Sequence, residues 1–152
     1  MPTLTEDSIY RIGFHLLRAA GAPDGHADTV ARHLADANLA GHDSHGIIQI
    51  PTYIDRVKRG HIVPGAPFEI TRETPNSTVV DGHWGFGYVV SERLMQITIE
   101  KAGAGGVAAA TVRRQSHVGR VADYPITAAS QGMIGIMTAD SGRPSKSVVP
   151  FG

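Results

Sequence analysis

Two histidines, each preceded by a serine, are the residues of this chain best suited to chemistry near neutral pH. His45 follows Ser44 in the run Leu39–Gly46, and His117 follows Ser116 far along the chain. An imidazole with its ordinary pKa of ~6.5 can donate or accept a proton near neutral pH. A serine hydroxyl can orient such a ring through a hydrogen bond. We therefore expect one polar site built from two separate segments, in which His45 transfers a proton and Ser44 holds its ring.

The turn around His45 also has other interpretations. Ser44 is a favoured residue at the start of a helix, and His45 could simply lie on the surface. His42 and His45 are three residues apart, which suits a metal ion, but a third ligand with a defined spacing is missing. Asp43, Ser44 and His45 together suggest a hydrolase, although consecutive side chains diverge and the motif G-x-S-x-G is absent. A histidine-metal hydrolase is therefore the weaker alternative.

The segment that follows His117 is a candidate for binding phosphate. Val118, Gly119, Arg120 and Val121 lie where a strand is expected to give way to a helix. Backbone N–H groups at the start of a helix attract anions, and an arginine adds positive charge. The alternative is an ordinary turn between a strand and a helix.

A glycine run at Gly103–Ala108 matches a loose G-x-G-x-x-A dinucleotide pattern. That loop must follow a strand and open a helix, whereas here a helix is expected before it and a strand after it. Glycines that end a helix explain the run. Any dinucleotide is therefore expected to bind without a Rossmann loop.

The residues before about position 60 predict helices that would position His45. Thr5 can cap a first helix that Gly21 ends, and Pro23 can start a second that closes near Gly41. A third helix is expected to begin at Ser44, with Pro51 kinking or dividing it.

In that third helix, His45, Gln49 and Tyr53 are spaced four apart and would form one polar stripe. The stripe would face either water or a cleft.

After Pro64 the pattern becomes rich in strands. Strands are expected at 68–71, 78–80, 106–112 and 133–138, and helices at 86–101 and 121–130. The fold class is therefore α/β in the α+β sense, with a helical region at 1–62 and a sheet domain from 63 to 152.

The composition is that of a globular protein. The 152 residues are 41% hydrophobic and 18% charged, with 14 basic and 14 acidic side chains and no cysteine. No basic run favours nucleic acid, and no apolar run approaches the roughly 20 residues that span a bilayer. The start of the chain is acidic where a signal peptide would be basic. We expect a cytoplasmic protein without nucleic-acid or membrane partners.

Several segments together resemble one family, the type-2 malate/L-lactate dehydrogenases. The resemblance covers nearly the whole chain in family order and is closest to the hydroxycarboxylate dehydrogenase B branch. It rests on the runs 37–47, 51–53, 81–87, 116–120 and 149–152.

The resemblance implies a fold and a function. The family has a helical N-terminal part and a non-Rossmann, largely antiparallel sheet domain that binds NAD(P)H, and its members are homodimers. Its substrates are 2-oxo and 2-hydroxy acids. By resemblance, His45 is the proton donor to the carbonyl oxygen, Ser44 its relay partner and Tyr53 part of the substrate site. The segment from His117 to Val121 would contact the cofactor.

The chain departs from the family pattern in two ways. Many members carry an arginine one turn after the catalytic histidine, where this chain has Gln49, which can hydrogen-bond but supplies no charge. Arg113, Arg120 or the helix start at Ser44 are the candidates to replace it. Family members are also more than twice as long, and the remainder holds further cofactor contacts and an aspartate of the relay. The alternative function is therefore a non-catalytic fragment that dimerises or binds a partner.

Overall fold

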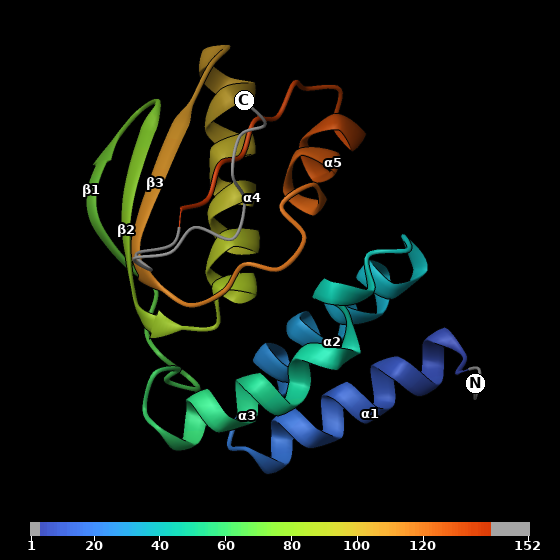
Figure 1. Cartoon of the computed structure of the whole chain (residues 1–152). Helices are drawn as coiled ribbons and strands as arrows, with labels where there is room; N and C mark the ends of the chain where they lie inside the picture. The colour runs from blue at the N-terminus through green and yellow to red at the C-terminus, as the bar shows by residue number, and fades with distance from the viewer. Residues whose placement is uncertain (1–3, 141–152) are drawn as a thin grey trace, which may run out of the picture.

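The structure, a computed structural model, describes residues 4–140. In this part of the chain, three helices are followed by a three-stranded sheet with two further helices beside it (Figure 1). The N-terminal helices are α1 (Glu6–Ala19), α2 (Asp24–Leu39) and α3 (Ile50–Lys58). The remaining elements are β1 (Glu69–Thr74), β2 (Ser77–Gly85), α4 (Gly87–Gly105), β3 (Ala109–Gln115) and α5 (Asp123–Ser130).

The first two helices form where their sequence patterns predict them. The hydroxyl of Thr5 accepts a hydrogen bond from the N–H of Ser8 at 3.2 Å, which confirms Thr5 as the cap of α1. Leu17, Val30 and Leu34 are fully buried between the helices. The same core continues into α3 and the start of α4, so it joins the helical layer to the sheet layer.

The third helix starts later than predicted. Residues Asp43–His45 and Ile47–Gln49 form two short 3-10 turns, and α3 begins at Ile50. Pro51 lies in the first turn of α3, where the missing N–H costs nothing, and it therefore neither kinks nor divides the helix. The prediction of a helix from Ser44 is wrong, and His45 and Gln49 do not share a helical stripe with Tyr53.

The sheet has the strand order β1-β2-β3 and is mixed. β1 runs antiparallel to β2, and β2 runs parallel to β3, with α4 as the crossover between them. Figure 1 shows α4 lying along one face of the sheet, with α5 next to it. Val80, Val90 and Leu94 fill the space between sheet and helix. The predicted α/β class with a helical N-terminal region is confirmed.

The predicted strand at residues 133–138 is wrong. No strand pairing occurs there among the residues that the structure describes. A strand needs a neighbour for its N–H and C=O groups, and this segment instead packs on α5. A Cβ on Gly135 would stand 2.8 Å from Pro125 and 2.9 Å from Ala128. Ile134 is 95% and Ile136 83% exposed. The motif at 149–152 lies outside the described residues.

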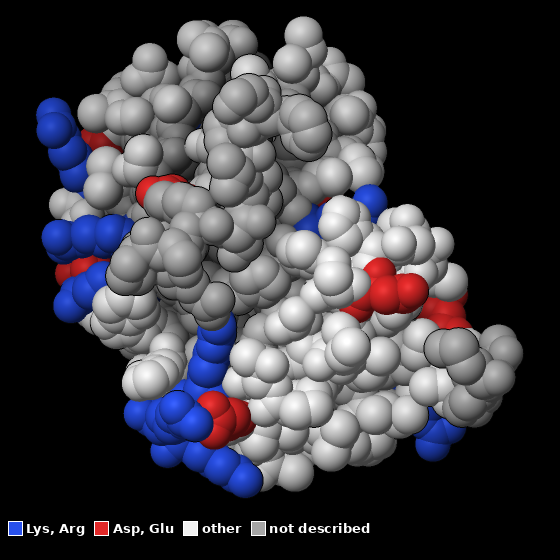
Figure 2. All heavy atoms as spheres, in the orientation of Figure 1, with Lys and Arg blue, Asp and Glu red and all other residues white. Residues whose placement is uncertain are grey.

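Charged side chains are distributed in small groups of both signs. Figure 2 shows lysines and arginines gathered beside the sheet and around the end of α3, with carboxylates among them. The last turn of α3 carries Arg56 and Lys58. None of the helices within residues 4–140 has the length and apolar character needed to cross a membrane.

Candidate active site

The turn that carries His45 is held in place by Asn38 at the end of α2. The Asn38 Nδ2 atom donates to Oδ1 of Asp43 at 2.6 Å, and its Oδ1 accepts from the N–H of Ile47 at 2.9 Å. Any Cβ on Gly46 would overlap the Asn38 side chain, so this close approach requires glycine. Asn38 therefore fixes the backbone on both sides of His45. Sequence reasoning assigned it no role.

Ser44 contacts the imidazole of His45 directly. The Ser44 Oγ atom lies 2.9 Å from Nδ1 of His45, as the sequence predicts. Gln49 folds back on the same turn, because its Nε2 donates to the Ser44 carbonyl oxygen at 2.6 Å. With Nδ1 held by serine, Nε2 is the nitrogen of His45 that can exchange a proton with another molecule.

The two Ser-His turns come together in space. The rings of His45 and His117 are stacked, with centroids 5.4 Å apart and planes at 30°. His42 meets His45 edge-on at 4.7 Å between centroids. Burial lowers the pKa of His45 below its usual value, and the charge of His42 lowers it further by a smaller amount. The half-buried His45 therefore favours its neutral form at neutral pH.

The loop after β3 carries His117 and is packed tightly onto α4. The N–H of Gly87 donates to Oγ of Ser116 at 3.0 Å, and any Cβ on Gly87 would overlap the Ser116 carbonyl. Gly119 has φ +71°, and a Cβ there would overlap the Tyr88 ring. These two glycines let the loop backbone lie directly on the helix, which fixes the position of His117.

Tyr53 approaches the site from α3 and is almost fully buried, with 1% of its surface exposed. Its hydroxyl lies 2.8 Å from Nδ1 of His117 and 2.9 Å from the hydroxyl of Tyr88. Burial raises the pKa of Tyr53 to about 12, so the hydroxyl keeps its proton. Tyr88 was missed by sequence reasoning, since nothing separates it from an ordinary core aromatic in α4.

The positive charge of Arg120, which was expected to attract phosphate, is paired with a carboxylate within the chain. Arg120 forms an ion pair with Asp123, the first residue of α5. A carboxylate at that helix start opposes the binding of a second anion. The Tyr124 hydroxyl donates to the Val118 carbonyl at 2.6 Å. Val121, the last residue of this segment, is half-buried.

Arg113 and Arg114 are also paired, with the buried carboxylate of Asp81. Arg114 Nε donates to Oδ1 of Asp81 at 2.9 Å, and Arg113 Nε lies 3.2 Å from Oδ2. Hydrogen bonding from Arg114 lowers the pKa of Asp81 to about 2. This cluster ties β2 to β3, so Arg113 does not replace the charge missing at Gln49.

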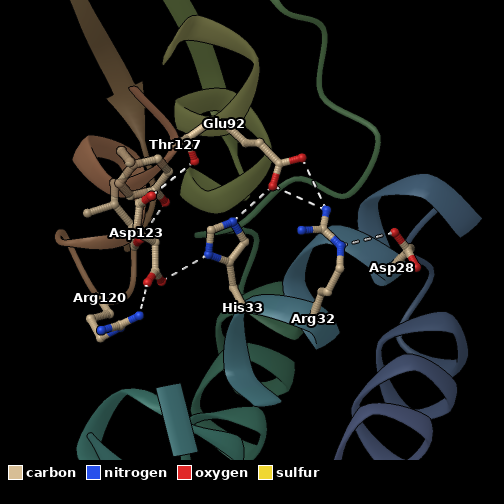
Figure 3. Close-up of polar contacts among 9 residues, drawn as sticks. Asp28, Arg32, His33, Glu92, Arg120, Asp123 and Thr127 are labelled. Atoms are coloured by element: carbon tan, nitrogen blue, oxygen red, sulfur yellow. Dashed lines mark hydrogen bonds and ion pairs between the residues drawn. The ribbon is translucent and has the colours of Figure 1, made fainter. Parts of the chain in front are cut away.

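A buried imidazole, His33, joins α2 to α4 and α5 (Figure 3). Its Nε2 lies 3.0 Å from Glu92 Oε2, and its Nδ1 lies 3.2 Å from Asp123 Oδ2. Arg32 pairs with the same Glu92. Burial lowers the pKa of His33, but the bonds to Asp123 and Glu92 outweigh it and raise the pKa overall. The sequence offered no spacing signal for this contact.

No group of three or more histidine, aspartate or glutamate side chains within residues 4–140 is arranged to hold a metal ion. His45 contacts His117 and His42 through ring stacking and an edge-on approach, respectively.

Comparison with known proteins decides the family. The family model described as malate/L-lactate dehydrogenase matches residues 5–152. The chain belongs to the malate/L-lactate dehydrogenase family. The predicted resemblance is thus confirmed.

Two curated members of the malate/L-lactate dehydrogenase family illustrate the extent of the similarity. Malate dehydrogenase of Pyrococcus abyssi is 36% identical over 93% of this chain and 39% of its own length. Hydroxycarboxylate dehydrogenase B of Escherichia coli O157:H7 is 36% identical over 80% of this chain and 34% of its own.

A solved structure agrees with the fold. Sulfolactate dehydrogenase from Methanocaldococcus jannaschii superimposes with a TM-score of 0.82 and 34% identity. The match covers 84% of this chain and 37% of that one. This family member therefore shares the fold of the described residues. The chain spans less than two fifths of the length of the malate dehydrogenase of Pyrococcus abyssi and of hydroxycarboxylate dehydrogenase B.

Proposed function

We propose that the polypeptide containing this chain is an NAD(P)H-dependent oxidoreductase that interconverts 2-oxo and 2-hydroxy acids. The observation that carries the proposal is the stacked pair His45 and His117, with Ser44 on Nδ1 of His45. The family supports the reaction class, since the relatives are named for malate, sulfolactate and hydroxycarboxylates.

The residues around the histidine pair suit the nicotinamide end of such a cofactor. Two half-buried imidazoles from separate segments stack there, and Ser44 holds Nδ1 of His45 but not Nε2. The glycine-packed loop from His117 to Val121 supplies backbone groups beside them. The charge of Arg120 is balanced by Asp123 within the chain, so it adds little net positive charge for the phosphates. Reduced nicotinamide, when bound, supplies hydride to C2 of the 2-oxo acid.

His45 supplies the proton for this reduction. Protonated His45 gives the proton on Nε2 to the carbonyl oxygen as that oxygen gains negative charge, and it becomes neutral. Ser44 remains bonded to Nδ1 and keeps the ring in place. In the opposite direction, neutral His45 accepts the hydroxyl proton of the 2-hydroxy acid. Gln49 is proposed to hydrogen-bond the substrate without adding charge.

The protein is proposed to act in the cytoplasm as a homodimer, with the domain boundary between residues 62 and 63. Tyr53 acts at the substrate site through His117, since its own hydroxyl is buried.

Replacement of His45 tests the proposed function. In the polypeptide that contains this chain, His45→Gln is expected to lower kcat about 100-fold or more, because general acid–base catalysis is lost. The dissociation constant of NAD(P)H is expected to stay unchanged. The measurement is NAD(P)H oxidation with a panel of 2-oxo acids, and His61→Gln, at an exposed position, is the control. Unchanged turnover in His45→Gln would contradict the proton transfer, and no turnover of any 2-oxo acid by the parent polypeptide would contradict the function.

A further inference from the structure

Two buried tyrosines form a hydrogen-bonded chain that ends on His117. Tyr88 from α4 and Tyr53 from α3 are each 1% exposed. Their hydroxyl oxygens are 2.9 Å apart, and the Tyr53 oxygen lies 2.8 Å from Nδ1 of His117. The three groups come from three separate segments, so this series of hydrogen bonds forms only in the folded protein.

The protons carried by the two tyrosine hydroxyls determine which atom donates in each of these hydrogen bonds. Burial raises the pKa of Tyr53 and, further still, that of Tyr88, so each hydroxyl carries a proton at neutral pH. Within residues 4–140, the Tyr88 hydroxyl has a single hydrogen-bond partner, Tyr53. Its proton must therefore point to the Tyr53 oxygen, and the proton of Tyr53 then points to Nδ1 of His117.

Donation in the opposite direction, from His117 through Tyr53 to Tyr88, is disfavoured by the burial of Tyr88. If Nδ1 of His117 carried a proton and donated to Tyr53, then Tyr53 would donate to Tyr88. The proton of Tyr88 would then have no acceptor, and an unpaired buried donor lowers the population of that state about tenfold or more. Nδ1 of His117 is therefore an acceptor.

Packing prevents Tyr88 from turning away from this arrangement. Any Cβ on Gly119 would overlap the Tyr88 ring, so the loop backbone lies directly against it. The ring of His33 lies 5.3 Å from the Tyr88 ring. The phenol is thus enclosed by the loop and by α2.

We propose that Tyr88 is a positioning residue: through Tyr53 it keeps Nδ1 of His117 as an acceptor, so that the ring proton resides on Nε2. His117 is then a hydrogen-bond donor at Nε2, a nitrogen that in this state pairs with acceptor oxygens such as a carboxylate or a carbonyl. The use of that donor rests on the proposed function, whereas the choice of tautomer does not.

Nitrogen NMR of the chain labelled with ¹⁵N-histidine tests the tautomer directly. In the parent chain, long-range ¹H–¹⁵N correlations are expected to show His117 protonated on Nε2 and unprotonated on Nδ1. In Tyr88→Phe, the Tyr53 hydroxyl can either donate or accept, so the population protonated on Nδ1 is expected to rise about threefold or more. The matched control is Tyr124→Phe, which removes a buried hydroxyl that bonds to Val118 of the same loop.

The outcomes separate this proposal from the proposed function. A parent chain with the proton on Nδ1 overturns the positioning role, and this result does not require Tyr88→Phe to fold. An unchanged tautomer in Tyr88→Phe, or the same change in Tyr124→Phe, also overturns it. If the tautomer responds as expected while no 2-oxo acid is reduced, the positioning role stands and the proposed function fails.

Discussion

At the scale of single residues, the neighbours of His45 have different effects on its ring. Ser44 orients the ring through Nδ1, and His42 stands edge-on against it at 4.7 Å between centroids. Burial is the larger cause of the lowered pKa of His45, and the charge on His42 adds to it. A lowered pKa favours the neutral, proton-accepting form, which suits oxidation of a hydroxy acid. Reduction requires the protonated form and is expected to speed up as the pH falls below ~6.5.

The first prediction concerns His42. His42→Asn removes a positive charge close to His45, so the pKa of His45 should rise toward its ordinary value of ~6.5. It should remain below that value, because burial is the larger cause. The measurement is an NMR titration of the His45 ring protons in the chain itself. His61→Asn is the control. A pKa of His45 that falls or stays constant in His42→Asn would refute electrostatic repulsion between His42 and His45.

At the scale of elements, close backbone packing determines where the His117 loop lies. Ser116 bonds to the start of α4, and Gly119 lies against Tyr88 of the same helix. The other side of the loop is held to α5 through the Val118 carbonyl. The loop is therefore positioned by glycine contacts and hydrogen bonds from two helices.

The second prediction uses two glycines with similar backbone angles. Gly119 has φ +71° and Gly132 has φ +74°, but an added Cβ meets the Tyr88 ring at the first position and nothing within 4 Å at the second. Gly132→Ala should cost about 1 kcal/mol through its backbone angle alone. Gly119→Ala should cost roughly 3 kcal/mol, because the overlap adds to it. Urea unfolding measures both, and equal costs would show that the contact with Tyr88 is unimportant.

The third prediction concerns the contact of His33 with α4 and α5. The pKa of His33 is raised in the folded state, so its stabilisation is complete below its unfolded value of ~6.5 and is lost as the pH rises through the folded value. Hydrogen bonding to His33 is the main reason why the pKa of Glu92 is lowered. The Glu92 contribution is therefore present above ~4.3 and is lost as the pH falls.

His33→Gln should accordingly destabilise the protein most between about pH 5 and 6.5, by roughly 2 kcal/mol. The difference from the parent chain should shrink as the pH rises through the folded pKa of His33. Urea unfolding across this pH range is the measurement, with the exposed His15→Gln as control. If the difference in the free energy of unfolding grew with rising pH, it would contradict an ion pair between protonated His33 and the carboxylates of Glu92 and Asp123.

At the scale of the whole molecule, one core connects the two layers. Leu34 of α2, Tyr53 of α3 and Phe86 before α4 belong to the same buried cluster. A second, smaller cluster lies between the sheet and α4. Ile134 and Ile136 belong to neither and are exposed. Stability should therefore depend on the cores and little on the side chains of Ile134 and Ile136.

The fourth prediction compares exposed and buried isoleucines. Ile134→Ser and Ile136→Ser should each change the free energy of unfolding by less than about 0.5 kcal/mol, because little surface is buried at either side chain. Ile99→Ser should cost about 3 kcal/mol, since Ile99 is 4% exposed in α4. Urea unfolding distinguishes the positions. A large loss at Ile134 would mean that this side chain is packed in solution.

Much of the local structure could be predicted from the sequence. Thr5 caps α1 because its hydroxyl reaches an N–H three residues away, a contact that the local sequence specifies. The glycine run before β3 predicts the end of a helix, and α4 closes there, with Gly106 at φ +81°. The predicted Ser44–His45 bond formed between adjacent residues. In each case the interacting groups lie within a few residues of each other.

The sequence by itself determined the helices other than α3 and the order of helical and sheet regions, and it singled out the two Ser-His turns whose rings stack. The tertiary structure alone decided the rest. Asn38 reaches nine residues along the chain to bond Ile47, which replaces a helix start at Ser44 with 3-10 turns. Tyr88 meets His117 through Tyr53 across three segments. Hydrogen bonds between distant residues depend on where the packed cores place the chain, and no local pattern encodes that placement.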